Sequence, residues 1–297
     1  MPVTLATHAM GTRFELVLEG GDPHRLRAAG EAALREIEEC HHRFNLFDPG
    51  SWLNSINRRA AAEPVTLDDL TFDLLETCRQ VHHDSGGAFD ITVAPLMRTW
   101  GFHGKPDREA IEQAKVRVGM RHVLLDRDTR AVRFAIPGVT LDLGGIAKGF
   151  AIDQAIDLLR EYGVSCALLH GGTSTVAAIG APPGEPGWRV KLHAPEVAAK
   201  DATVVCLNNQ TLSVSAPHGR VVNHDGETLG HVLDPRTCHP ADCGAYAAAV
   251  GGSACLTDAW ATALLVLGET PAAMPDSIQA VLPDQNQPAP MLEDAYA

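Results

Sequence analysis

The sequence predicts an α+β fold, a mixed α/β architecture in which a mainly antiparallel sheet forms the core and helices pack against it. Helical and strand-like stretches both occur, but they do not alternate regularly, which disfavours a doubly wound parallel sheet. The 297 residues, 45% of them hydrophobic, are ample for one large core or for two intertwined sub-domains. We therefore expect a single domain over residues 1–297, with a short strand and a loose C-terminal tail at residues 278–297.

In the N-terminal third, the Asp22-Pro23 pair is a good helix start, and the residues after it repeat apolar side chains at helical spacing. Thr66, with Asp69 three residues later, likewise indicates a helix start. The expected elements are a strand at 14–18, a helix at 24–41, a turn at 47–51 and a second helix from Thr66.

The rest of the chain is richer in strand-like runs. A Pro137-Gly138 turn separates two of them, and Gly163 ends a predicted helix. The expected strands lie at 131–136, 139–143, 164–169, 188–193, 203–208, 211–215 and 245–250, and the expected helices at 146–161 and 257–267.

The charge of the chain limits its partners. With 24 basic and 37 acidic residues, its formal net charge is -13, so we expect no nucleic-acid partner and no stable membrane contact. An anionic substrate would need a local positive potential from a cation, a lysine or a helix N-terminus. Seven cysteines, an odd number, and an N-terminus without a signal-peptide pattern favour reduced thiols and a cytoplasmic location, although a trimmed exported protein would look the same.

The strongest local pattern is VTLDLGGIAKGFAID at 139–153. An apolar run delivers Asp142 to a Gly-Gly turn, and a helix follows with Lys148 in its first turn. Glycine lets backbone N–H groups approach a phosphate closely, Lys148 adds positive charge, and Asp142 offers an acceptor for a base or a ribose. A tight strand-to-helix turn with a surface lysine is an equally good interpretation of this pattern alone.

A second pattern places Asp258 and Thr262 four residues apart, so their oxygens project from one face of a helix. A carboxylate and a hydroxyl form a partial site of hard oxygens that suits Mg²⁺, which takes its remaining ligands from water and phosphates. Taken alone, the pair is more simply a capped helix start. Zinc is disfavoured, because the cysteines lack paired C-x₂-C spacing.

Two further segments could carry chemistry. His231 precedes an Asp-Pro-Arg-Thr turn that begins at Asp234, and an imidazole titrates near neutral pH. A structural histidine is the commoner outcome. The run GGAFDIT at 86–92 could wall a flat aromatic ligand or form a plain loop.

Six segments, taken in order, resemble the ApbE family of flavin transferases, or FAD:protein FMN transferases. They cover nearly the whole chain from residue 10 to about residue 268: MGTRFEL at 10–16, GGAFDITVAPLMRTWGF at 86–102, LDLGGIAKGFAID at 141–153, GWRVKLHAP at 187–195, HVLDPRTCHP at 231–240 and LTDAWATALLVLG at 256–268. The resemblance implies an ApbE-like, T-fold-like architecture.

The resemblance also implies roles for individual residues. A metal-binding pair is implied at Asp258 and Thr262, with the backbone carbonyl of Gly145 completing the site. His231 stands at a histidine thought to act in catalysis, and Asp234 nearby could orient it. The positions implied to contact FAD are Met10, Phe47, Ala88, Phe89, Asp90, Asp142, Lys148 and Leu233.

The implied reaction is Mg²⁺-dependent transfer of FMN from FAD to a Thr or Ser hydroxyl of an acceptor protein, with release of AMP. The alternatives are a Mg²⁺-dependent FAD pyrophosphatase that gives FMN and AMP, and a flavin-binding or storage protein without turnover. This chain departs from the usual family pattern at Phe47, often Tyr, and at three further positions: Thr173, Ala216 and Cys238.

Overall fold

The computed structural model describes residues 2–107, 110–193, 203–217, 221–224, 227–241, 246–282 and 291–294. A seven-stranded sheet forms its centre, in the order β1-β2-β6-β7-β10-β15-β16, and every neighbouring pair is antiparallel. Its strands are β1 Val3–Ala9, β2 Thr12–Leu18, β6 Ala167–Gly171, β7 Thr175–Ile179, β10 Thr211–Ser215, β15 Ala247–Gly251 and β16 Gln279–Val281. This confirms the predicted α+β fold with a mainly antiparallel sheet core.

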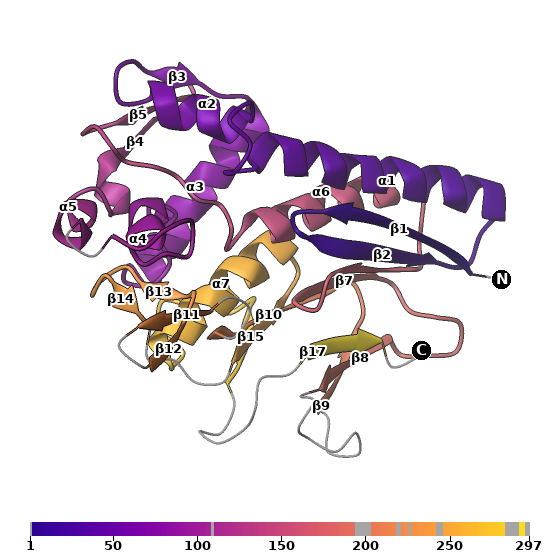
Figure 1. Cartoon of the computed structure of the whole chain (residues 1–297). Helices are drawn as coiled ribbons and strands as arrows, with labels where there is room; N and C mark the ends of the chain where they lie inside the picture. Colours follow the sequence, from indigo (N-terminus) through magenta and orange to yellow (C-terminus); the bar gives the residue numbers. More distant parts are fainter. Residues whose placement is uncertain are drawn as a thin grey trace.

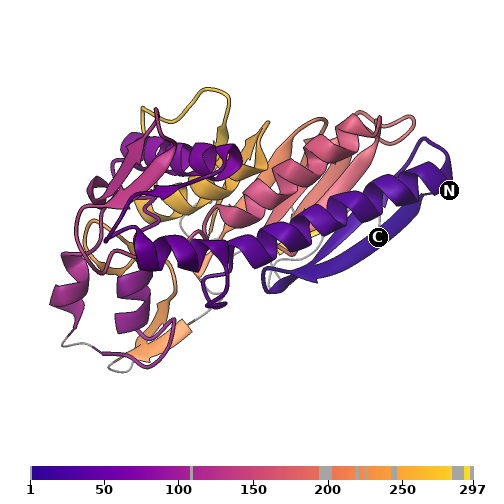
Figure 2. The ribbon, with the colours of Figure 1, turned by 90° about the horizontal axis from the view of Figure 1, so that it is seen from above.

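Three helices cover one face of this sheet: α1 Pro23–Phe44, α6 Ala147–Glu161 and α7 Ala254–Leu267. Helix α1 packs on α6, and α6 packs on α7 (Figures 1 and 2). Side chains alternate across a strand, so Ala167 and Leu169 of β6 face the helices, whereas Leu168 faces the opposite side.

The opposite face of the sheet packs against a small three-stranded sheet in the order β17-β8-β9 (Figure 1). Trp188 of β8 is buried there with Leu168 and donates its indole N–H to the carbonyl of Ile179, 3.3 Å away. The strands are β8 Trp188–His193, β9 Thr203–Leu207 and β17 Met291–Asp294.

Shorter helices and strands lie on the left of Figure 1, beside α7 and the C-terminal end of α1. Trp100 joins two of them, because its indole N–H donates to the carbonyl of Cys238, 3.0 Å away. The helices are α2 Trp52–Arg59, α3 Asp69–Asp84, α4 Ala94–Thr99, α5 Ile111–Lys115 and the 3₁₀ turn η1 Met120–His122; the strands are β3 Val65–Thr66, β4 Val123–Asp126, β5 Ala131–Phe134, β11 Val221–His224, β12 Glu227–Gly230, β13 Leu233–Asp234 and β14 His239–Pro240.

Several predicted elements differ from the structure in type or in their first residue. Residues 139–143 form no strand. The Leu141 N–H donates to Oδ1 of Asn57 at 2.8 Å, and the Leu141 carbonyl accepts a hydrogen bond from Nδ2 of Asn57 at 3.1 Å, so the backbone of Leu141 bonds to a side chain instead of a neighbouring strand. Helix α3 begins at Asp69, not near Thr66, since Asp68 is the residue that caps it. Strands β1 and β7 and helix α2 were not predicted.

Two strands fall within residues 278–297, where we expected a short strand and a loose tail. Strand β16 pairs with β15 at the edge of the main sheet, and β17 pairs with β8. Residues 283–290 and 295–297 lie outside the described residues, as does residue 245 of the strand expected at 245–250. The single domain over residues 1–297 stays a prediction. Among the described residues, no helix has both the length and the apolar character needed to cross a membrane.

Candidate active site

The candidate site begins where α6 and α7 touch at Gly149. A Cβ atom at this position would lie 2.1 Å from the carbonyl oxygen of Ala254 and 2.8 Å from Cβ of Asp258. No real side chain tolerates such distances, so only glycine allows the two helices to pack this closely. The close packing brings Lys148, next to Gly149 on α6, against Asp258 of α7.

Lys148 and Asp258 form a largely buried ion pair. The Lys148 ammonium donates to both carboxylate oxygens, at 3.1 Å to Oδ1 and 3.3 Å to Oδ2, and the backbone N–H of Gly149 donates to Oδ2 at 3.0 Å. Lys148 also donates to Oγ1 of Thr175 on β7, 3.1 Å away. The side chains of Lys148 and Asp258 are only 18% and 6% exposed, so little water screens the two charges.

A second carboxylate, Asp153, holds α7 in place from α6. It accepts hydrogen bonds from the Ser253 hydroxyl at 2.6 Å and from the first N–H groups of α7, Ala254 at 2.7 Å and Cys255 at 2.9 Å. Burial raises the pKa of Asp153 above its usual value, and these hydrogen bonds oppose the shift. Asp153 therefore ties the helix that carries Asp258 to the helix that carries Lys148.

Hydroxyl and carbonyl oxygens lie one turn along α7 from Asp258. Oγ1 of Thr262 lies 3.2 Å from Oγ of Ser215 at the end of β10 and donates to the carbonyl of Asp258 at 3.3 Å. Gly145 lies against the same hydroxyl, since a Cβ there would be 3.3 Å from it. The structure thus brings the three predicted metal ligands to one place.

This donor set fits a hard divalent cation. Among the residues that the structure describes, no three His, Cys, Asp or Glu side chains gather as metal ligands. Asp258 is the one carboxylate among the three predicted ligands. Mg²⁺ suits such a site, because it binds through one or two carboxylates and takes waters and substrate phosphates as its other ligands.

The turn before α6 forms a second part of the site. Oδ1 of Asp142 accepts the N–H of Gly144 at 2.9 Å, which fixes the Gly-Gly turn, and Oδ2 lies 3.7 Å from Nε2 of His103. The His103 ring meets the Phe47 ring edge to face, with their centroids 5.1 Å apart. Phe47 is 63% exposed, although large apolar side chains are normally buried, so its free face is open to a planar ligand.

Met10 occupies the hairpin between β1 and β2 with a positive φ of 49°, and its N–H donates to Nδ1 of His41 at 3.1 Å. Strand β2 of this hairpin lies close to Lys148, because a Cβ at Gly171 would lie 3.0 Å from the Phe14 ring and 3.5 Å from Cγ of Lys148. Of the residues predicted to contact FAD, four are buried, so a ligand could reach them mainly through their main chain: Ala88, Phe89, Asp90 and Leu233.

The carboxylate of Asp90 has a structural role. Its Oδ1 accepts the N–H and hydroxyl of Thr92, at 2.7 and 2.5 Å, and its Oδ2 accepts the N–H of Met120 at 3.2 Å and lies 3.3 Å from Nδ1 of His82. It therefore holds the loop after α3 onto η1. Phe89, beside it, packs near Gly145.

Asp234, which we expected to orient His231, forms an ion pair with Arg236. Asp234 bonds to Arg236 through two side-chain contacts, Nε to Oδ1 at 2.9 Å and Nη2 to Oδ2 at 2.8 Å. Burial works against ionisation of Asp234, but these hydrogen bonds outweigh it and hold its pKa below the usual value. A planar guanidinium matches a carboxylate well, so Arg236 fixes the position of Asp234. The expected role of Asp234 in orienting His231 stays a prediction.

His231 lies near the metal-ligand candidates through the end of β10. Its Nδ1 is 3.3 Å from the carbonyl of Pro217, and Pro217 follows Ser215 by two residues. Because the Ser215 hydroxyl contacts Thr262, the end of β10 lies between His231 and the cluster around Asp258.

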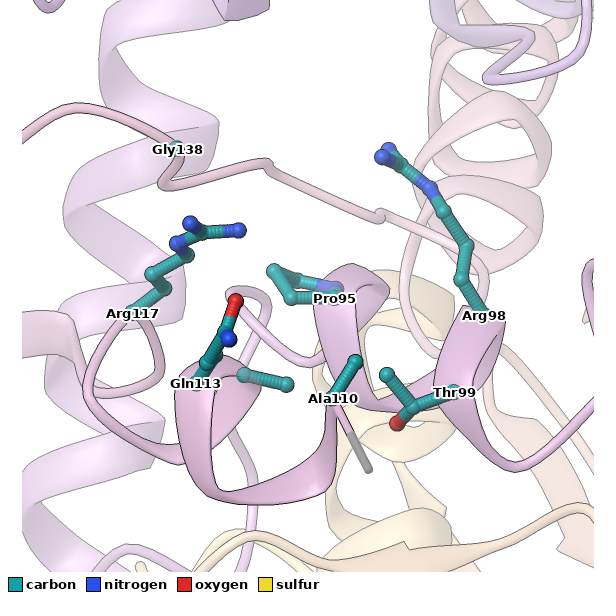
Figure 3. Close-up of a pocket in the computed structure, with 8 residues that line it drawn as sticks. Pro95, Arg98, Thr99, Ala110, Gln113, Arg117 and Gly138 are labelled. Atoms are coloured by element: carbon teal, nitrogen blue, oxygen red, sulfur yellow. The ribbon is translucent and has the colours of Figure 1, made fainter. Parts of the chain in front are cut away.

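A separate pocket of about 160 Å³ lies between α4 and α5 (Figure 3). Arg98 and Arg117 stand at its rim, above Pro95 and Gln113. None of the predicted site residues lines this pocket.

Three side chains at the site were not predicted: Thr175, Ser215 and Asp153. Thr175 and Ser215 are the end residues of strands, and hydroxyls are common there, so nothing in the sequence marked them. Asp153 stands inside the 139–153 pattern, five residues after Lys148, and an acidic residue inside a helix could have been recognised as a cap for a neighbouring helix.

Solved structures share this fold. The ApbE protein of Thermotoga maritima is 29% identical with a TM-score of 0.80, and the match covers 90% of this chain and 87% of that one. The apo form of the flavinyl transferase ApbE from Pseudomonas stutzeri is 25% identical with a TM-score of 0.78, covering 90% and 84%. The fold and the site therefore define an α+β protein of the flavin transferase type.

The sequence comparisons name the family. The sequence profile of the ApbE family matches residues 10–281, and the chain belongs to that family. A FAD:protein FMN transferase of Klebsiella pneumoniae is 32% identical over 224 residues, which is 73% of this chain and 69% of the relative. The FAD:protein FMN transferase of Escherichia coli K12 is 27% identical over 271 residues, 87% of this chain and 76% of the relative.

Proposed function

We propose that this chain is a transferase that moves FMN from FAD to a Thr or Ser hydroxyl of an acceptor protein and releases AMP. The observation that carries the proposal is the buried Lys148–Asp258 pair directly after the Asp142–Gly145 turn, with the exposed Phe47 ring beside it. A diphosphate needs the cation and the glycine turn, and a flat ring system needs the aromatic face. The relatives named FAD:protein FMN transferase support flavin transfer in general.

The residues that would hold Mg²⁺ are Asp258 and Thr262, with the carbonyl of Gly145. When bound, Mg²⁺ supplies positive charge against the negative charge that gathers on the diphosphate during phosphoryl transfer. Lys148 adds a second positive charge, and the N–H groups of the turn at 144–145 can bind phosphate oxygens. The ring of Phe47 stacks on the flavin. Asp142 accepts a hydrogen bond from the flavin or from a ribose.

The acceptor hydroxyl attacks the phosphorus on the FMN side, a new P–O bond forms, and the bond to AMP breaks with the bridging oxygen leaving on AMP. His231 accepts the hydroxyl proton, because a neutral imidazole can act as a general base. We expect Asp234, which Arg236 holds in place, to orient His231.

The decisive experiment incubates the protein with FAD, MgCl₂ and an acceptor protein that carries a Ser/Thr flavinylation sequence, with and without EDTA. We expect flavin fluorescence on the acceptor band of a denaturing gel, lost with EDTA and lost when the target residue is changed to Ala. Free FMN without a labelled band would instead identify a FAD pyrophosphatase. FAD that stays bound and intact for days would identify a flavin-binding or storage protein.

The base is tested by His231→Ala. Loss of a general base lowers the rate by about 10²–10⁴-fold, while FAD affinity should be unchanged. His239→Ala is the matched control, since His239 is exposed and its ring contacts Trp100 rather than the site. Undiminished transfer by His231→Ala would remove this residue from the mechanism.

A further inference from the structure

The Lys148–Asp258 ion pair affects how the candidate site can bind a cation. Asp258 is the single carboxylate among the candidate metal ligands, and both of its oxygens already receive the Lys148 ammonium, at 3.1 and 3.3 Å. The Gly149 N–H fills a further acceptor position on Oδ2. A divalent cation that binds Asp258 must therefore share the carboxylate with an ammonium group.

Such sharing is unfavourable, because like charges a few ångströms apart repel strongly where little water screens them. The side chains of both residues are mostly buried. Lys148 also has a second partner, Oγ1 of Thr175, which holds the ammonium at Asp258 rather than letting it turn to solvent. The diphosphate of a bound dinucleotide would offer Lys148 an alternative anionic partner.

We propose that Lys148 competes with the divalent cation for Asp258, and that a bound diphosphate relieves the competition by drawing Lys148 away. Metal and dinucleotide then bind cooperatively, each raising the affinity for the other by the same factor. This inference rests on the proposed function. It assigns Lys148 a regulatory role at the site in addition to contact with phosphate.

The first test needs metal alone. Mn²⁺, a spectroscopic substitute for Mg²⁺, is titrated into the flavin-free protein and free Mn²⁺ is measured by electron paramagnetic resonance. Lys148→Gln should bind Mn²⁺ more tightly than the unchanged protein, by roughly tenfold, a typical size for coupling between two sites. Lys115→Gln is the matched control: it removes the same charge from an exposed pair with Glu112 and should leave the affinity unchanged.

A second variant covers the case in which Lys148→Gln does not fold. Thr175→Val keeps Lys148 and a buried side chain of the same shape at position 175, but it removes one of the two partners of Lys148. It should therefore raise Mn²⁺ affinity by a smaller factor than Lys148→Gln does. Equal or weaker Mn²⁺ binding by both variants would overturn the inference alone. Failure of both the unchanged protein and Lys148→Gln to bind Mn²⁺, or binding that Asp258→Asn leaves intact, would overturn the inference and the metal site together.

The third measurement tests cooperativity. FAD affinity is measured from flavin fluorescence with and without MgCl₂, in the absence of acceptor. We expect Mg²⁺ to increase FAD affinity of the unchanged protein and of Lys115→Gln by a larger factor than in Lys148→Gln. An equal factor in all three would show that Lys148 does not couple the two ligands, even if FAD and metal both bind.

Discussion

Phe47 is exposed although it is a large aromatic residue, and the structure explains what holds it there. Its ring meets His103 edge to face, and Nε2 of His103 lies 3.7 Å from Asp142. The Phe47 N–H donates to Oδ1 of Asn45, 2.9 Å away, which fixes the backbone. The ring is thus positioned by neighbours that leave one face open.

We expect Phe47→Ala to weaken FAD binding by about 1–3 kcal/mol, the cost of losing one aromatic stacking partner. Phe47→Tyr should bind as well as the unchanged protein, because the ring is retained. The measurement is a titration followed by flavin fluorescence, and the melting temperature should not change, since the side chain is exposed. Equal affinity of the Ala and Tyr variants would show that the flavin does not stack here.

At the scale of elements, the site depends on how closely α6 and α7 approach. Gly149 lies against the backbone of Ala254, and the structure leaves no room there for a methyl group. By contrast, a Cβ at Gly252, just before α7, would meet no atom within 4 Å.

Gly149→Ala should destabilise the protein by about 1–3 kcal/mol or more, because overpacking forces the backbone to shift. It should also lower transferase activity, since the shift separates Lys148 from Asp258. Gly252→Ala adds the same methyl group in open space and should change stability by less than about 0.5 kcal/mol. Urea unfolding of both variants measures the difference, and a similar loss in both would contradict the close-packing argument.

Asp153 provides the second connection between these helices. Asp153→Ala should cost about 2 kcal/mol or more, because it removes a helix cap and leaves the first N–H groups of α7 buried without an acceptor. Asp157→Ala, one turn later on the same helix, removes only an exposed contact with Arg160 and should be nearly neutral. Thermal unfolding compares the two, and equal melting temperatures would show that Asp153 does not anchor α7.

At the scale of the whole molecule, acid stability depends on carboxylates with arginine partners. Hydrogen bonds from Arg127 and Arg79 to Glu76, and from Arg236 to Asp234, outweigh burial and hold both pKa values below their usual range. The folded state therefore binds fewer protons than the unfolded chain in mildly acidic solution, and stability falls as protons are added.

We expect the contribution of Glu76 and Asp234 to the free energy of unfolding to be constant above about pH 5. This contribution should decrease as the pH falls through about 4 toward about 3. Asp234→Asn cannot titrate, so the decrease should be shallower in this variant. Asp153 acts in the opposite direction: burial raises its pKa, so its contribution is greatest below about pH 4 and is lost as the pH rises. An unchanged acid slope in Asp234→Asn would show that the Arg236 pair does not control it.

The sequence by itself determined the fold class, most helices, and the segments that we propose to carry the chemistry. Helix spacing and caps are local, so α1, α6 and α7 could be read from the chain. The Asp258–Thr262 pair and the Gly-Gly-x-x-Lys turn each depend on residues a few positions apart, and periodicity places such residues on one face.

Only the tertiary structure decided which distant residues meet. Lys148 and Asp258 are 110 positions apart, and their contact depends on helix packing that Gly149 permits. Thr175 and Ser215 join them from separate strands, and Asp234 pairs with its neighbour Arg236. Local periodicity fixes the face on which a side chain lies, but the packing of helices on the sheet decides what that face contacts.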